Sequence, residues 1–259
     1  MLKSRKDLVE IRLACKTSLS IEKKRILVCA GTGCISSGSL DIYERLSQII
    51  QERNIPCSLE LRPENNPIGD NTSEDNQGSA DWVGIKKSGC HGLCEMGPLV
   101  RIEPEGYLYT KVMLSDCEEI IEKTIIGNDN IKRLAYQKCG AVYKQQEEIP
   151  FYKKQTRLVL DQCGHIDATS IKEYLGFDGY SAFEKALFDM NGDGIVQEIL
   201  NSNLRGRGGG GFPAGKKWLQ VKGQTAEQKY IVCNGDEGDP GAFMDRSIME
   251  GDPHRILEG

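Results

Sequence analysis

The sequence has no long apolar run, and this absence excludes a membrane-spanning helix. Nowhere in its 259 residues is there a run that approaches the roughly 18 apolar residues such a helix needs. The N-terminus, MLKSRKDLVEIRLACK, is interrupted by charged residues too often for a secretory signal. We therefore expect a cytoplasmic protein that does not insert directly into a membrane.

An excess of positive charge is also lacking. The 33 Lys and Arg residues are outnumbered by 38 Asp and Glu residues, which gives a formal net charge of −5. A nucleic-acid partner is therefore not expected, because phosphate backbones attract basic surfaces. With 39% hydrophobic and 27% charged residues, the composition is typical of a globular protein, and the length suggests about two domains.

Cysteine, in contrast, is abundant, with 10 residues. Without an export signal a disulfide framework is disfavoured, so clustered cysteines indicate metal or redox chemistry. Two tight pairs stand out, Cys29 with Cys34 and Cys90 with Cys94. The remaining cysteines are isolated along the chain and are most simply interpreted as small buried hydrophobic residues.

Each cysteine pair lies in a loop that directly follows a predicted strand. The apolar runs at 25–30 and 81–90 predict these two strands. Residues 98–112 predict a hairpin that turns at Glu105 and Gly106, and residues 65–81 predict a polar insertion without chemistry. An amphipathic helix is expected between the two cysteine loops, with one face formed by Leu40, Tyr43, Leu46 and Ile50.

The spacing C-x4-C followed at a distance by C-x3-C favours a 2Fe-2S cluster. Thiolates suit zinc, copper(I) and iron-sulfur clusters, but structural zinc usually uses closer C-x2-C knuckles. A 2Fe-2S cluster needs four thiolates, which two facing loops can supply. A zinc staple and four simple core cysteines remain the alternatives. Close approach of the backbone to a cluster would be eased by Gly31, Gly33, Gly89, Gly92 and Gly97.

The segments CAGTGC and SGCHGLCEMGP resemble the two ligand loops of the thioredoxin-like 2Fe-2S ferredoxins, over roughly residues 22–126. The resemblance implies that the cluster ligands are Cys29, Cys34, Cys90 and Cys94. His91 lies inside the second pair, and we expect it to form hydrogen bonds or face solvent, because four thiolates already complete the cluster.

The second half of the sequence contains a glycine cluster, RGRGGGGFPAGKKW, at 205–218. It is not a Rossmann fingerprint, because a predicted helix precedes it, and it is not a P-loop, because Lys217 replaces the Ser or Thr that would bind magnesium. Exposed backbone N–H groups beside lysines instead predict a cradle for a phosphate and a flat ring. A flexible linker is the alternative.

A predicted strand at 229–234 leads into an acidic loop. The loop carries Asn234, Asp236, Glu237 and Asp239, whose oxygens could accept hydrogen bonds from the hydroxyls of a sugar alcohol. A solvated turn and a magnesium site are the alternatives.

These two segments resemble the flavin domain of the FMN- and NADH-binding subunit of respiratory complex I, and its relatives in soluble NAD(P)-reducing hydrogenases and formate dehydrogenases. The resemblance runs from about Phe151 to Gly259. It implies that Phe212 and Asp239 lie where the family receives the nicotinamide dinucleotide. It also implies that FMN is held by Gly206, Arg207, Gly208, Gly209, Gly210, Lys217, Asn234, Asp236 and Glu237.

Together, the resemblances imply an α/β protein: a thioredoxin-like 2Fe-2S ferredoxin domain followed by the N-terminal part of an α/β FMN-binding domain. We expect an N-terminal extension at 1–21, the ferredoxin domain at 22–126, a polar linker with some helix at 127–150, and a partial FMN- and NADH-binding domain at 151–259. The family continues well beyond the first flavin loop, so the sequence looks like a C-terminally truncated piece.

The function implied by the resemblance is that of a diaphorase subunit, which passes electrons between NAD(H) or NADP(H), FMN and iron-sulfur clusters. No general base is needed, so no catalytic side chain is predicted. Expected partners are a hydrogenase or dehydrogenase catalytic subunit, a small 2Fe-2S subunit and ferredoxin. Asp239 and Gly210 replace the Glu and Ala common in complex I, which favours electron-bifurcating or NADP-reducing iron hydrogenases. The alternative is a 2Fe-2S carrier or docking module with a vestigial flavin part.

Overall fold

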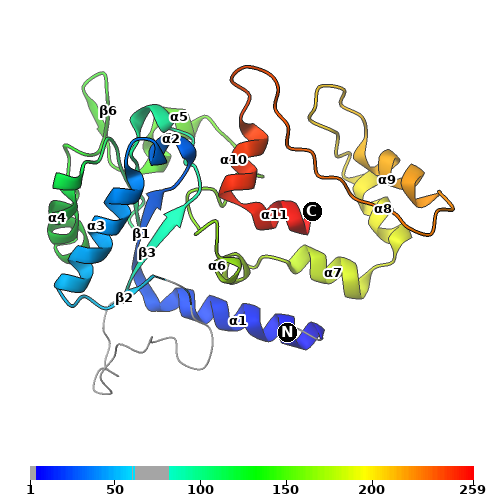
Figure 1. The fold of residues 1–259 in the computed structure, drawn as a ribbon, viewed down its shortest axis with the longest axis horizontal. Coiled ribbons are helices and arrows are strands. Elements are labelled where there is room, and N and C mark those ends of the chain that lie inside the picture. The colour runs from blue at the N-terminus through cyan, green and yellow to red at the C-terminus, as the bar shows by residue number, and fades with distance from the viewer. Residues whose placement is uncertain (1–3, 60, 62–81) are drawn as a thin grey trace. The chain divides into compact units, whose positions relative to one another are not determined.

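The structure is a computed structural model that describes residues 4–59, 61 and 82–259 (Figure 1). The described chain divides into two compact units. Unit 1 contains the described residues up to Gly179 together with Glu237–Gly259, and unit 2 contains Tyr180–Asp236. The predicted insertion lies outside the described residues. No helix in the described part of the chain is long and apolar enough to cross a membrane.

Unit 1 is built on a mixed five-stranded sheet with the strand order β2-β3-β1-β4-β5. The central strand β1 pairs parallel with β3 and antiparallel with β4. The predicted α/β class, the two strands that precede the cysteine loops and the hairpin at Glu105 and Gly106 are confirmed. The strands are β1 (Glu22–Cys29), β2 (Cys57–Ser58), β3 (Trp82–Ser88), β4 (Val100–Glu103) and β5 (Tyr107–Tyr109).

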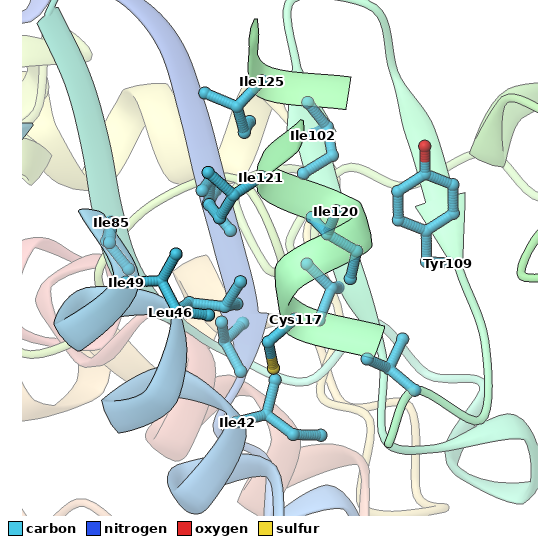
Figure 2. Packing of buried hydrophobic residues seen from close by; sticks show 14 of the residues in the cluster. Ile42, Leu46, Ile49, Ile85, Ile102, Tyr109, Cys117, Ile120, Ile121 and Ile125 are labelled. Carbon is cyan, nitrogen blue, oxygen red and sulfur yellow. The ribbon is translucent and has the colours of Figure 1, made fainter. Parts of the chain in front are cut away.

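Two helical segments pack together against the sheet and form the main hydrophobic core. One is α3 (Ser39–Glu52), and the other is α4 (Cys117–Glu119), which continues as the π-helix η3 (Ile120–Ile126). The sheet contributes Ile85 and Ile102 to this core. Figure 2 shows the facing side chains of the two segments, which are Ile42, Leu46, Ile49, Cys117, Ile120, Ile121 and Ile125.

The buried face of α3 differs in part from the predicted one. Leu46 and Ile50 are fully buried as predicted, but Leu40 and Tyr43 are half-buried. The buried face is completed by Ile42 and Ile49 instead. An amphipathic pattern defines a broad apolar stripe, and docking against the sheet decides which edge of that stripe is covered.

The segment predicted as a linker, 127–150, packs into unit 1 through its own apolar residues. Ile131 and Leu134 join the main core, and Ile149 joins a second cluster with Cys29 and Cys34. The segment forms a hairpin of β6 (Tyr136–Lys138) and β7 (Ala141–Tyr143) and then a short 3-10 turn, η4 (Gln146–Glu148).

The remaining elements of unit 1 are short except for the N-terminal helix. This helix, α1 (Arg5–Ile21), packs against α6 (Ile171–Gly176) so closely that a Cβ on Gly176 would overlap Leu19 Cδ1. The others are α2 (Thr32–Ile35), η1 (Cys94–Met96), η2 (Leu114–Asp116), α5 (Pro150–Lys153), α10 (Met244–Gly251) and α11 (Pro253–Glu258).

A buried ionic network joins the sheet to α6. The fully buried carboxylate of Glu173 lies 2.5 Å from Arg25 and 3.4 Å from the ammonium of Lys86. Both cations also pair with Glu22, at 3.1 Å and 3.0 Å. Glu173 additionally accepts a hydrogen bond from the backbone N–H of Asp167 at 2.8 Å. Two anions and two cations therefore compensate one another away from solvent.

Unit 2 contains α7 (Ser181–Asp189), α8 (Gly192–Asn201) and α9 (Ala214–Lys222), and α8 is the helix that was predicted to precede the glycine cluster. Asn191 caps α8 by accepting a hydrogen bond from the Gly194 N–H at 2.8 Å. The predicted strand at 229–234 is wrong. Its side chains are exposed, with Ile231 fully accessible, and no described strand pairs with it. An isolated β-segment has no neighbouring strand with which its backbone N–H and C=O groups can form hydrogen bonds, so the extended conformation is not stabilised.

Candidate functional site

The sheet brings the two cysteine loops to one edge. Cys29 is the last residue of β1, and its register partner in β3 is Ser88, two residues before Cys90. Because β1 and β3 are parallel, the loops that follow them leave the sheet on the same side. The Ala30 N–H donates to the Ser88 carbonyl at 2.8 Å, which fastens the start of the first loop to the end of β3.

Glycines allow the two loops to touch. A Cβ on Gly31 would lie 2.8 Å from Cys90 Cβ, and a Cβ on Gly97 would lie 2.8 Å from Cys34 Sγ. These distances are too short for real side chains, so the contact requires glycine at both positions. The Sγ atoms of Cys90 and Cys94 lie 3.5 Å apart. The predicted convergence of the two pairs is therefore present in the backbone.

The four thiols differ in exposure and are linked by hydrogen bonds. Cys29 and Cys34 are fully buried, Cys90 is half-buried and Cys94 is exposed. Hydrogen bonding to Cys34 raises the pKa of Cys29 to about 12, and the same contact lowers the pKa of Cys34. Hydrogen bonding to Cys29 likewise raises the pKa of Cys90. A metal bound here would replace these protons, so its affinity would rise with pH.

The arrangement fits the demands of a 2Fe-2S cluster. In residues 4–59, 61 and 82–259, no group of three or more His, Cys, Asp or Glu side chains is placed so that it could hold one metal ion. A 2Fe-2S cluster makes a different demand, because each of its two irons takes two thiolates. Here two loops carry two cysteines each and meet through glycines. The ligand assignment itself stays a prediction.

His91 anchors the second loop by hydrogen bonds, which is one of the two arrangements expected for it. Its ring is fully buried, with Nε2 3.0 Å from the Ser88 hydroxyl and Nδ1 3.0 Å from the Gln146 amide oxygen. Burial lowers the pKa of His91 to about 3, so the ring is neutral. Its carbonyl accepts hydrogen bonds from the Tyr152 hydroxyl and from Arg157, at 3.0 Å and 2.9 Å.

The glycine cluster of unit 2 forms an open loop closed by backbone hydrogen bonds. The Gly206 N–H donates to the Phe212 carbonyl at 2.9 Å, and Arg205 bonds the Gly211 carbonyl at 3.2 Å. A Cβ on Gly208, Gly209, Gly210 or Gly211 would meet no atom within 4 Å. Arg207 at the same loop is exposed. The backbone of this loop is therefore accessible to a ligand.

Lys217 and Phe212 lie next to each other at this loop. The Lys217 ammonium sits 5.7 Å from the centre of the Phe212 ring, within range of a cation–π contact. In the acidic segment, Asn234 accepts a hydrogen bond from the Asp236 N–H at 3.0 Å. Unit 2 therefore presents an ammonium, an aromatic ring and exposed acidic oxygens. The roles of these residues in cofactor binding stay predictions.

Glu237 and Asp239 belong to unit 1. The Glu237 carboxylate accepts hydrogen bonds from the N–H groups of Asp245 and Arg246, at 3.0 Å and 3.2 Å, and so caps the N-terminus of α10. The sequence does not indicate this role, because Glu237 lies seven residues before the first residue of α10 and no local capping motif marks it. Asp239 is exposed, and its carbonyl accepts a hydrogen bond from Ala242 N–H at 3.1 Å.

Comparisons with known proteins find curated relatives that match about two fifths of the chain. The chain is 50% identical over 106 residues to HndC, a subunit of the NADP-reducing hydrogenase of Solidesulfovibrio fructosivorans, covering 41% of this chain and 21% of that protein. It is 50% identical over 96 residues to an NADH-quinone oxidoreductase subunit of Rhizobium meliloti, covering 37% of this chain and 22% of that protein. The chain thus spans about a fifth of the length of these curated relatives.

Among solved structures, the thioredoxin-like [2Fe-2S] ferredoxin of Aquifex aeolicus matches with 25% identity and a TM-score of 0.31, covering 45% of this chain and 99% of the ferredoxin. An NAD+-reducing [NiFe]-hydrogenase in the air-oxidised state matches with 19% identity and a TM-score of 0.31, covering 94% of this chain and 38% of that chain. The family model of the Nuo51 FMN-binding domain matches residues 199–259. Over these residues the chain is therefore similar to the Nuo51 FMN-binding domain, and the resemblance to the flavin domain found in the sequence is confirmed there.

Proposed function

We propose that this chain is the 2Fe-2S and FMN-binding part of a diaphorase subunit that oxidises NAD(P)H or reduces NAD(P). It would act in the cytoplasm within a soluble hydrogenase-type complex. Its partners would be a hydrogenase or dehydrogenase catalytic subunit, a small 2Fe-2S subunit and ferredoxin. The observation that carries the proposal is the convergence of two cysteine loops at one edge of the sheet of unit 1.

The cluster would be held by Cys29, Cys34, Cys90 and Cys94. Cys29 and Cys34 lie in the buried part of the site, whereas Cys94 is exposed. The cluster would therefore have one shielded side and one side open to a redox partner. Solvent exposure and hydrogen bonds to sulfur are the main determinants of its potential. The Gly92 N–H already points at Cys90 Sγ, 3.3 Å away.

FMN would bind at the open glycine loop of unit 2. When bound, FMN supplies the exchange between two-electron and one-electron carriers that nicotinamide and iron-sulfur centres require. The exposed N–H groups of Gly208, Gly209 and Gly210 suit a phosphate, and Lys217 adds a positive charge beside them. Asn234 and Asp236 would accept hydrogen bonds from the hydroxyls of FMN. Phe212 would offer a flat apolar surface to the nicotinamide dinucleotide.

The relatives support this proposal through their names. One belongs to an NADP-reducing hydrogenase, and several others belong to NADH-quinone oxidoreductases. The departures at Asp239 and Gly210, together with the cysteine-containing part of unit 1, favour the hydrogenase type.

The purified chain, prepared without oxygen, tests the proposal directly. We expect visible absorbance, iron and acid-labile sulfide in equal amounts at about two each per chain, an EPR signal after reduction with dithionite, and FMN released by acid. Cys90→Ala should abolish the EPR signal, because it removes a ligand and leaves no oxygen in its place. Cys139→Ala is the matched control, since Cys139 is an exposed free cysteine on the β6–β7 hairpin, and it should leave iron content unchanged.

A cluster-bearing carrier or docking module without flavin is the second candidate. It is favoured by the exposure of Tyr230, Ile231 and Val232, which leaves the segment before the acidic loop unpaired in the described chain. Iron with sulfide but no flavin would support this candidate. Zinc without visible absorbance would contradict both candidates.

A further inference from the structure

The helix α10 contacts the first cysteine loop through a polar triad. The Thr32 hydroxyl, which lies between Cys29 and Cys34 in sequence, donates to the Glu250 carboxylate, whose two oxygens are each 3.1 Å away. The guanidinium of Arg246 donates to the same hydroxyl, and its Nε lies 2.7 Å from Glu250. A charged pair on α10 is thus fixed onto the loop that carries half of the predicted ligands.

The same helix contacts the second cysteine loop through its backbone. A Cβ on Gly89, the residue before Cys90, would overlap the Cα of Gly251, the last residue of α10. A Cβ on Gly251 would lie 3.7 Å from the Cys90 backbone nitrogen. At its other end, α10 is capped by Glu237. The helix therefore contacts both cysteine loops, and its N-terminus is bound by Glu237 of the acidic segment.

The position of Arg246 makes its charge relevant to the cysteines. Its guanidinium donates to the Thr32 hydroxyl, and Thr32 lies three residues after Cys29 and two before Cys34. One-electron reduction of a 2Fe-2S cluster adds one negative charge and makes or breaks no bond. A fixed cation nearby therefore favours the reduced form, and a fixed anion opposes it.

We propose that Arg246 and Glu250 of α10 form a charge pair that sets the reduction potential of the cluster, with Arg246 raising the potential and Glu250 lowering it. Both act as positioning residues through the field at the cluster, and neither is a ligand. The inference rests on the proposed function, since it requires the cluster. It adds that the segment similar to the FMN-binding domain controls the electron affinity of the centre it contacts.

Redox titration of the anaerobically purified chain, followed by EPR, tests the inference. Arg246→Gln should lower the equilibrium constant for one-electron reduction by about threefold to tenfold, which corresponds to roughly 30 to 60 mV. Glu250→Gln should raise it by a similar factor. Both shifts should become smaller at high salt, because the side chains of Arg246 and Glu250 are 51% and 38% exposed to solvent.

Arg53→Gln provides the matched control, because it also removes a guanidinium paired with carboxylates, Glu118 and Glu122. Arg53 directly follows α3, at the end of the helix that is farther from the first cysteine loop. The 14 residues of α3 make the helix about 20 Å long. This distance exceeds the screening length of about 10 Å at 0.1 M salt. The control should change the equilibrium constant by less than about twofold.

The outcomes separate the two proposals. Absence of iron and sulfide from the wild-type chain would refute the proposed function. A wild-type cluster whose potential is unmoved by both variants, or moved in the same direction by both, would overturn the charge-pair inference and leave the proposed function standing. If Arg246→Gln fails to hold a cluster, Arg246→Lys decides the question, since it should retain both the charge and the wild-type potential. Unchanged EPR g-values in the shifted variants would support a field effect over a changed ligand geometry.

Discussion

Replacing Glu173 by Gln should destabilise unit 1 strongly, although the two side chains have nearly the same size. Glu173 is fully buried and accepts hydrogen bonds from Arg25 and from the Asp167 N–H, with Lys86 3.4 Å away. The amide would leave two buried cations facing a single carboxylate, that of Glu22. The variant therefore tests whether charge balance inside the protein, and not volume, holds α6 against the sheet.

The expected loss is about 3–5 kcal/mol of unfolding free energy, the usual cost of breaking a buried ion pair on one side. Such a loss would be a large fraction of the roughly 5–15 kcal/mol by which folded proteins are stable. Glu118→Gln is the matched control. Glu118 also binds two cations, Arg45 at 2.6 Å and Arg53 at 2.7 Å, but its side chain is 45% exposed. Its loss should stay below about 1 kcal/mol.

Urea denaturation followed by far-UV circular dichroism compares the two variants. A second measurement uses the double variant Lys86→Met with Glu173→Gln, which removes one charge of each sign and should lose less than the sum of its single variants. Equal and small losses for Glu173→Gln and Glu118→Gln would refute the reasoning. So would a double variant whose losses simply add.

Three further predictions concern the cysteine site and acid stability. Gly97→Ala should reduce bound iron at least severalfold, because its Cβ would lie 2.8 Å from Cys34 Sγ, whereas Gly238→Ala, where a Cβ meets nothing within 4 Å, should retain it; iron analysis decides. Burial alone would raise the pKa of Glu103. Hydrogen bonds from His165 and Arg101, together with the positive charge of Arg101, outweigh this effect and lower the pKa to about 2. Ionised Glu103 therefore stabilises the folded state above about pH 4.3, which is the pKa of a Glu in the unfolded chain. This stabilisation is lost as the pH falls toward 2, so the difference in unfolding free energy between wild type and Glu103→Gln should become smaller over that range. A difference that stays constant during an acid titration would contradict this reasoning. Removing iron with a chelator should lower the thermal midpoint of the chain, since the proposed cluster would bind only the folded state; an unchanged midpoint would show that iron binding does not stabilise the fold.

The sequence predicted the parts of the site that depend on short stretches of chain. The strand before Cys29, the strand before Cys90 and the turn at Glu105 and Gly106 all have local signals, and all are present. The convergence of the cysteine loops followed from their position after strands. Parallel pairing of those strands then brought them to one edge.

Features that depend on distant residues were not predicted. Arg25 and Glu173 are 148 positions apart, and each is an ordinary charged residue in its own segment. The contact of Thr32 with Glu250 spans 218 positions, so no periodicity could reveal it. The error at 229–234 has the same origin, because β-propensity states what a segment can form, and only a neighbouring strand decides whether it does.

The contact between Gly89 and Gly251 leaves no side chain between two stretches of backbone. Side chains usually accommodate small shifts by rotating, but two main chains in direct contact cannot adjust in this way. A movement of α10 by a few tenths of an ångström would therefore be transmitted directly to the peptide that carries Cys90. For the same reason, neither position can take a larger residue without moving the helix, so a side chain at either one should disturb the second cysteine loop.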